Sequence, residues 1–247
     1  MTKSSVKIIA DLHIHTISSG HAYSTIEEYV KKAKEIGLKG IAITDHGPAL
    51  PGGPHFYHFS NLRMVPKELD GIRIYKGAEC NIVNDKGELD LPDEVLKDLD
   101  IVMGTFHTRT GYDSQGEEID TKVLLRALNN PYVNVIAHPG NPMYPVRVKD
   151  IVAKAKEKNI VIEINNSSFT GSRKGSYDKC LEFAREIKET GWKVIISSDA
   201  HMSTMLGTFS EALKLIEEAG LTEENVVNTS LERIEREIVQ LPRRQPS

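Results

Sequence analysis

The sequence predicts an α/β fold in which parallel strands are joined by crossover helices. Seven apolar runs of strand length recur along the 247 residues, and amphipathic segments of helical length separate several of them. A chain of this length can form one α/β barrel or two smaller domains. Because no linker, repeat or low-complexity block interrupts the pattern, we expect a single domain over residues 1–247.

The predicted strands and helices follow one another along the chain. The strands are Val6 to Leu12, Gly40 to Thr44, Ile72 to Gly77, Ile101 to Gly104, Val133 to Ala137, Ile160 to Ile164 and Val194 to Ser197. The helices, which have apolar residues at helical spacing, are Thr25 to Ile36, Thr121 to Asn129, Lys149 to Lys158, Ser176 to Thr190 and Thr208 to Ala219. Ser24 or Thr25 can cap the first helix, and Gly37 can end it.

Three segments depart from this alternation. Asp85 to Pro92 contains a Lys-Gly pair and predicts a turn, which could form a small hairpin before the fourth strand. Pro48 to Pro54 holds three prolines and two glycines and predicts a long loop of the kind that borders a site. The tail from Pro242 to Ser247 is expected to be frayed.

The composition excludes several classes of protein. A formal net charge of -4 and a pI near 6.2 argue against a broad basic face for duplex nucleic acid and favour a small substrate. We expect no signal peptide, because the N-terminal residues lack its apolar stretch, and no membrane span, because no apolar run reaches the roughly 18 residues that one needs. Cys80 and Cys180 have no metal-binding spacing and indicate buried thiols in a reducing compartment. We therefore expect a cytoplasmic protein.

Side chains of the types that bind metal ions follow the carboxyl ends of the predicted strands. The candidates are His13, His15, His21, His46, Glu79, His107, His138, Asp199 and His201. In a β/α barrel these strand ends converge on one face, so residues distant in sequence would meet there.

The spacing of these residues strengthens the case, because positions two apart in a strand share a side. In the segment from Asp11 to His15 the three polar residues can point one way, while Leu12 and Ile14 face the helices. Asp199 and His201 have the same spacing. If the barrel closes, these two segments adjoin.

An isolated histidine is more often a surface or hydrogen-bonded core residue than a metal ligand. That interpretation explains poorly why seven of the nine histidines lie on one predicted face, whereas imidazoles and carboxylates together are typical of divalent metal sites. The sequence therefore predicts a metal cluster. His55 and His58, beside the proline-rich loop, can equally be surface residues or substrate contacts.

The stretches DLHIHT, HAYST, TDHG, GAEC, GTFH, AHPGNP, EINNSS and SSDAH resemble the PHP (polymerase and histidinol phosphatase) superfamily, in particular its small YcdX-like phosphatases. The resemblance extends from Asp11 to about Gly207. It implies a distorted seven-stranded (β/α)7 barrel, similar to a TIM barrel, with a trinuclear metal site. Zinc is the implied metal, three ions per subunit, with Mn2+ or Fe2+ as alternatives. Each family ligand position is filled by one of the nine candidates.

The resemblance also suggests how the ligands are shared, since one tetrahedral zinc ion uses only about four. It implies one ion on His13, His15, Glu79 and Asp199, a second on Glu79, His107 and His138, and a third on His21, His46 and His201. Glu79 would bridge two ions, because a carboxylate has two oxygens.

The predicted function is hydrolysis of small phosphate monoesters. Metal ions that share a water lower its pKa, and the resulting hydroxide, held at the ions bound by Glu79 and Asp199, is the predicted nucleophile. Asp11 could fix an imidazole tautomer or make a hydrogen bond in the barrel core.

Further residues are candidates for substrate binding. Arg173 and Lys174 could hold phosphate or form a solvated loop. Asn165 and Asn166 could bind substrate or brace the loop after the sixth strand.

Two other functions remain open at this point. The same metals could cleave phosphodiesters, as in a nuclease, although the sequence shows little basic flanking surface. A non-catalytic metal-binding or regulatory domain would instead have closed coordination. The sequence does not identify the substrate, the general acid for the leaving group or the native metal, and it leaves open whether the chain forms a homo-oligomer.

Overall fold

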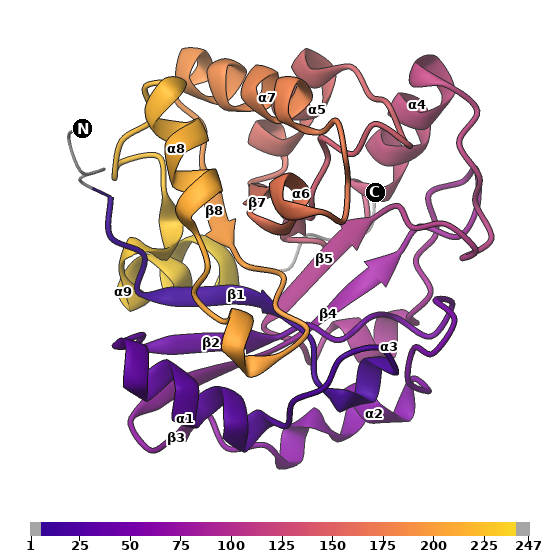
Figure 1. Cartoon of the computed structure of the whole chain (residues 1–247). Helices are drawn as coiled ribbons and strands as arrows, with labels where there is room; N and C mark the ends of the chain where they lie inside the picture. The colour runs from indigo at the N-terminus through magenta and orange to yellow at the C-terminus, as the bar shows by residue number, and fades with distance from the viewer. Residues whose placement is uncertain (1–5, 241–247) are drawn as a thin grey trace.

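The computed structural model describes residues 6–240, which form a nearly closed barrel of seven parallel strands with helices between them (Figure 1). The strands are β1 (Ala10–Ile14), β2 (Gly40–Ile43), β3 (Glu68–Leu69), β4 (Ile72–Asn81), β5 (Ile101–Thr105), β6 (Val135–Ile136), β7 (Val161–Asn165) and β8 (Val194–Ser197). The barrel order is β1-β2-β4-β5-β6-β7-β8, and β3 pairs antiparallel with β4 outside this path. The predicted α/β barrel is thus confirmed, whereas the expected frayed tail lies outside the described residues.

The helices surround the sheet. They are α1 (Ile26–Ile36), α2 (Tyr57–Asn61), α3 (Asp93–Leu96), α4 (Glu117–Ala127), α5 (Val148–Glu157), α6 (Ser167–Thr170), α7 (Tyr177–Thr190), α8 (Ser210–Glu218) and α9 (Leu231–Ile234), with short turns η1 (Ile17–Ser19), η2 (Leu62–Met64), η3 (Ser203–Met205), η4 (Val227–Thr229) and η5 (Glu235–Val239). All five predicted helices are present. Within residues 6–240 none has both the length and the apolarity to cross a membrane.

The first helix shows how the sequence sets its own boundaries. Thr25 caps α1 in a capping box with Glu28, and Gly37 ends the helix in the left-handed conformation, at a φ of 83°. A side-chain oxygen at the N-cap satisfies a free backbone N–H, and glycine adopts positive φ without a steric penalty. Both boundary predictions are confirmed. The short helices and β3 were missed because segments this short show no clear period.

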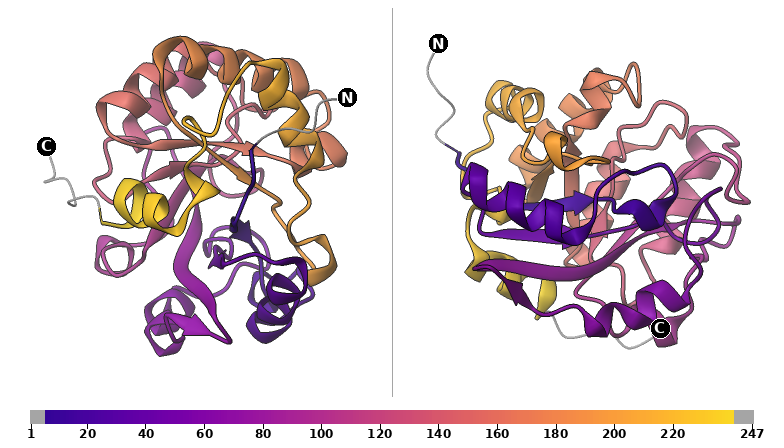
Figure 2. Two further views of the ribbon diagram at one scale, coloured as in Figure 1. Left: turned by 90° about the vertical axis from the view of Figure 1, so that its left-hand side faces the viewer. Right: turned by 60° about the horizontal axis from the view of Figure 1, so that its bottom comes forward.

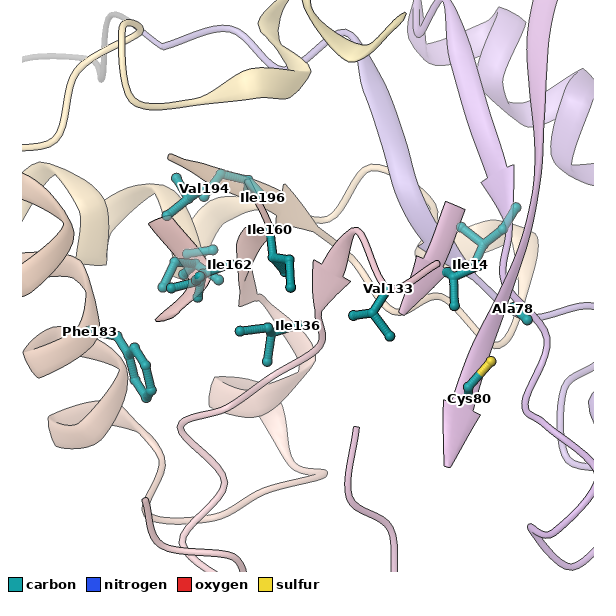
Figure 3. Packing of buried hydrophobic residues seen from close by; sticks show 14 of the residues in the cluster. Ile14, Ala78, Cys80, Val133, Ile136, Ile160, Ile162, Phe183, Val194 and Ile196 are labelled. Atoms are coloured by element: carbon teal, nitrogen blue, oxygen red, sulfur yellow. The ribbon is translucent and has the colours of Figure 1, made fainter. Parts of the chain in front are cut away.

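Side chains of the sheet alternate between two apolar layers. One layer fills the barrel and includes Leu12, Ala42 and Ile195. The other lies between the sheet and the helices, where Phe183 of α7 faces Ile162 of β7 (Figure 3). The two layers form the hydrophobic core on either side of the sheet.

The position of Leu12 corrects one prediction. Leu12 packs inside the barrel, whereas Ile14 belongs to the outer layer, so the two do not both face the helices. The register between β1 and β2 shifts between Asp11 and Ile14. Such an irregularity breaks the alternation of side chains within the strand. The alternation of side chains every two residues, on which the prediction relied, therefore does not hold through the segment that carries His13 and His15.

The next segment differs in one detail from the prediction and agrees with it in another. β4 continues to Asn81, so Glu79 lies within this strand and not after it. Beyond it, an antiparallel bridge between Ile82 and Leu89 forms a minimal hairpin around the predicted turn.

Both cysteines are free and buried, as predicted, while the cellular compartment stays a prediction.

The barrel closes between β1 and β8 without a regular ladder of hydrogen bonds. Near the carboxyl ends, the carbonyl of Ala200 accepts a hydrogen bond from His15 N at 2.9 Å. At the other end Asn228 of η4 fills the gap: its Nδ2 donates to Ala10 O at 2.8 Å and to Ile196 O at 2.7 Å, and its Oδ1 accepts from Ile196 N at 3.1 Å. Figure 2 (left) looks toward this end, where the yellow C-terminal segment lies.

Replacing Asn228 with alanine tests the importance of this closure. The Asn228→Ala change leaves buried N–H and C=O groups of both strands without partners, so we expect the free energy of unfolding to fall by about 2–4 kcal/mol. Urea denaturation measures the change. Asn61→Ala, at the exposed end of α2, is the control and should shift the value by less than about 0.5 kcal/mol. Equal effects of the two changes would contradict the assigned role of Asn228.

Candidate metal centre

Glu79 lies at the centre of the predicted ligands. It is fully buried, and its two carboxylate oxygens lie within 3.5 Å of five imidazole nitrogens. The distances are 2.7 Å to His46 Nδ1, 2.7 Å to His138 Nε2, 3.4 Å to His13 Nε2, 3.5 Å to His15 Nε2 and 3.5 Å to His107 Nε2. Residues from strands far apart in the sequence thus surround one carboxylate.

Asp199 extends the cluster across the seam of the barrel. Its Oδ1 lies 3.1 Å from His15 Nε2, 3.6 Å from His13 Nε2 and 3.6 Å from His201 Nδ1. His21 is connected through His201, because their Nε2 atoms are 3.2 Å apart. All nine predicted ligands therefore lie in one continuous cluster at the carboxyl ends of the strands.

Three groups of these residues have ligand atoms within 4.8 Å of one another. They are His13, His15 and Asp199; His46, Glu79 and His107; and His15, His46 and His201. The first group agrees with the first ion that the resemblance implies. His46, which the resemblance assigns to the third ion alone, also lies with Glu79 and His107. The division of ligands among ions thus stays a proposal.

Several buried polar atoms in this cluster have no hydrogen-bond partner. They are both ring nitrogens of His46, Oε2 of Glu79 and Oδ1 of Asp199. His46 Nδ1 and Glu79 Oε2 lie 2.7 Å apart, but they do not have the geometry of a hydrogen bond. Unpaired buried polar atoms cost free energy, so a group of them facing one another indicates a missing partner. Neutral imidazoles and carboxylates are the ligands that zinc and related divalent cations prefer. The residues present therefore fit bound divalent cations.

A second layer of side chains orients the histidines from behind. His13 Nδ1 lies 2.6 Å from Glu163 Oε1, and His107 Nδ1 lies 2.8 Å from Asn81 Oδ1. Thr105 Oγ1 lies 3.3 Å from His138 Nδ1. A partner on one ring nitrogen sets the tautomer and directs the other nitrogen to the cluster.

Sequence reasoning missed these orienting residues, although a signal was present. Asn81 lies two positions after Glu79 in β4, and Thr105, the last residue of β5, lies two positions before His107. Glu163 is a charged residue inside the apolar run predicted as the sixth strand. A buried charge in such a run needs a partner.

Asp45 anchors the loop after β1, which carries the candidate ligands His15 and His21. Its carboxylate accepts hydrogen bonds from Thr16 N at 2.7 Å and from Ser19 Oγ at 2.6 Å, and it lies 3.1 Å from His58 Nε2. Ser19 Oγ in turn accepts a hydrogen bond from His46 N at 3.1 Å. His58 therefore contacts this buried carboxylate, whereas His55 is exposed.

Charges within the cluster compensate one another. Burial alone would raise the pKa values of Glu79 and Asp199, but neighbouring imidazoles, and Arg173 for Asp199, hold both well below their usual range. Burial lowers the pKa of His15 to about 3. The pKa of His13 is instead held well above 6.5, because nearby carboxylates, Glu163 first, outweigh its burial. Without a cation, these carboxylates therefore favour the protonated form of His13.

A cavity of about 670 Å³ opens above the cluster. His21, His46, His107, Asp199 and His201 line it, together with Arg173. This volume suits a small ligand.

The predicted substrate residues differ in how they approach this cavity. Arg173 Nη2 lies 3.1 Å from Asp199 Oδ2, and Asn165 Nδ2 donates to the same oxygen at 3.2 Å. Lys174 lines a separate cavity between α6 and α7, so the geometry gives it no support as a substrate residue. Asn166 Oδ1 accepts hydrogen bonds from the first turn of α8.

Asp11 makes contacts within the barrel wall. Its carboxylate accepts hydrogen bonds from Ser198 N and Oγ at 3.1 and 2.5 Å, and from Gly207 N at 3.1 Å. Burial raises the pKa of Asp11 to about 6. These contacts hold the loop after β8 against β1, and a role in setting a tautomer stays a prediction.

Comparison with known proteins shows extensive similarity. A family model described as the PHP domain matches residues 11–167. A protein named as a probable phosphatase in Thermoanaerobacter sp. is 48% identical over 229 residues, which cover 93% of this chain and 94% of that protein. A probable phosphatase of Shewanella sediminis is 44% identical over 229 residues, which cover 93% of each chain.

Two solved structures are similar in fold. The histidinol phosphate phosphatase of Lactococcus lactis, complexed with zinc, L-histidinol and phosphate, has a TM-score of 0.57 at 18% identity and covers 86% of this chain and 94% of its own. A probable 2-pyrone-4,6-dicarboxylic acid hydrolase of Acinetobacter baumannii has a TM-score of 0.55 at 17% identity and covers 95% of this chain and all of its own, 100%. The family model and the near full-length relatives confirm the resemblance seen in the sequence, and the chain belongs to the PHP domain family.

Proposed function

We propose that this protein is a metal-dependent phosphatase that hydrolyses small phosphate monoesters with three divalent cations, zinc foremost. The observation that carries the proposal is the buried cluster of imidazoles and carboxylates, with unpaired polar atoms, at the floor of an open cavity. The names of the relatives, which are probable phosphatases at 42–48% identity, support the same reaction. Mn2+ and Fe2+ are the alternatives to zinc, since the same ligands bind them.

The cavity provides binding groups for a phosphate ester. Bound divalent cations supply an activated water and positive charge for the phosphoryl oxygens. Arg173 presents a planar guanidinium that can bind two phosphate oxygens at once. With Asp199 holding a cation, the guanidinium of Arg173 would interact less strongly with that carboxylate and could turn to the substrate. Asn165 keeps Asp199 in position through its 3.2 Å hydrogen bond.

The first prediction concerns the reaction itself. We expect metal-depleted protein to be inactive, and zinc to restore hydrolysis of p-nitrophenyl phosphate, with turnover of bis(p-nitrophenyl) phosphate at least about tenfold lower. His138→Ala removes a ligand that lies 2.7 Å from Glu79 and should lower kcat/KM by about 100-fold or more. A preference for the diester would favour a nuclease-type reaction, and binding of zinc without any turnover would favour a regulatory domain.

The second prediction concerns Arg173. Arg173→Met removes a charged phosphate contact, so we expect kcat/KM for p-nitrophenyl phosphate to fall about 10- to 100-fold. Lys174→Met is the matched control at the next position, and because Lys174 lines a different cavity it should change kcat/KM by less than about twofold. If Lys174→Met has the larger effect, the assignment of these two residues is reversed.

The third prediction follows from the raised pKa of His13. A cation can bind His13 Nε2 only after the imidazolium loses its proton, so metal binding should release protons and strengthen as the pH rises. Zinc titration by calorimetry in two buffers of different ionisation enthalpy at pH 7 should show release of about one proton or more. Glu163→Gln removes the carboxylate that contributes most to raising this pKa and should reduce the release. Equal heats in the two buffers would contradict the prediction.

A further inference from the structure

Left-handed backbone conformations outside glycine are rare in this protein and concentrate at the candidate site. Within residues 6–240 the residues are Asp70, Arg109, His138, Asn159 and Asp199. Aspartate and asparagine tolerate this conformation better than other residues, and two of the five are candidate metal ligands. Arg109, at a φ of 66°, is neither an aspartate or asparagine nor a candidate metal ligand. Strained residues of this kind persist where the surrounding structure fixes them, and they cluster at functional sites.

The loop around Arg109 is fixed on both sides. Thr110 Oγ1 donates to the carbonyl of His107 at 2.8 Å. Gly111 lies so close to the Val83 carbonyl that an added Cβ would be 2.7 Å from its oxygen. The backbone of Arg109 therefore has little freedom to relax, and a glycine at this position would relieve the strain. A functional role of the arginine side chain would explain why this strained position is not occupied by glycine.

The side chain of Arg109 lines the cavity above the metal ligands. It is exposed, and no acidic residue in the described part of the chain forms an ion pair with it. Arg109 follows the candidate ligand His107 by two residues, which span at most about 7 Å. Its guanidinium can therefore reach a group that is one short linker away from a phosphate held at the cluster.

The other residues of the wall do not neutralise this charge. Leu50, Pro51, Met143 and Met205 are apolar, and the acidic side chain that lines the cavity, Asp199, already contacts Arg173. A guanidinium binds carboxylates and phosphates through two parallel hydrogen bonds. Arg109 is thus a second guanidinium in the cavity besides Arg173, and it has no ion-pair partner among residues 6–240.

We propose that Arg109 binds a second anionic group of the substrate, so that the substrates are phosphate monoesters whose alcohol part carries a carboxylate or another phosphate. This inference rests on the proposed phosphatase function and specifies its substrate class. Arg109 is then a specificity-determining residue, which a simple aryl phosphate does not use.

Binding of phosphonates tests the inference without turnover. The zinc-loaded protein is titrated by calorimetry with propylphosphonate, 3-phosphonopropionate and ethylene-1,2-bisphosphonate, which share an ethylene spacer next to phosphorus. We expect one or both of the doubly anionic ligands to bind at least about tenfold more tightly than propylphosphonate, equivalent to about 1.4 kcal/mol. Their order identifies the second group as carboxylate or phosphate. No preference over propylphosphonate would overturn the inference.

Arg109→Gly should abolish this preference and leave the affinity for propylphosphonate unchanged. Because glycine adopts the left-handed conformation freely, the variant should unfold at the same temperature as the wild-type protein or higher. Arg109→Asn, which also tolerates this conformation, provides a second variant with the same expected loss. Asn159→Gly, at another left-handed position outside the cavity, is the control and should keep the preference.

Two outcomes contradict the inference, and they differ from failure of the proposed function. Retention of the preference in Arg109→Gly, or an equal loss of affinity for all three ligands, would show that Arg109 does not bind a second anion. If p-nitrophenyl phosphate is hydrolysed while the preference is absent, the inference alone is wrong. If the preference is present but no phosphate monoester is hydrolysed, the proposed reaction is wrong and the anion site remains.

Discussion

Contact between β1 and β8 is the constraint on which the site depends. His13 lies in β1, His15 follows it directly, and Asp199 follows β8. The 3.1 Å approach of His15 to Asp199 therefore exists only if the barrel closes. Closure uses few backbone hydrogen bonds. The amide of Asn228 and the hydroxyl of Tyr29, which lies 2.9 Å from the carbonyls of His15 and Ala200, replace the missing ladder.

Closure also creates an electrostatic demand that the protein alone meets only in part. Three carboxylates, those of Glu79, Glu163 and Asp199, are buried and lie within 3.6 Å of His13, and Asp199 also contacts Arg173. The unpaired atoms in the same place show that hydrogen bonds do not complete this balance. Divalent cations would complete it, which connects the stability of the cluster to its proposed chemistry.

The sequence predicted those parts of the structure that local patterns specify. The cap at Thr25 and the stop at Gly37 follow from side-chain and backbone chemistry within one turn, and both were found. The inner position of Leu12 was predicted wrongly, because a register shift in β1 overrides the two-residue alternation. Likewise, Lys174 next to Arg173 looks equivalent in sequence, but its side chain lines a different cavity.

By itself, the sequence determined the order of strands and helices and the set of residues that lie at the carboxyl ends of the strands, because hydrophobic period and strand polarity are local properties. Only the tertiary structure decided that Glu163 supports His13, that Asp11 holds the loop at Ser198, and that Asn228 joins β1 to β8. The sequence separation is 150 residues for His13 and Glu163, 187 for Asp11 and Ser198, and 218 for Ala10 and Asn228. No local pattern encodes such pairs, since they arise only when the chain closes on itself.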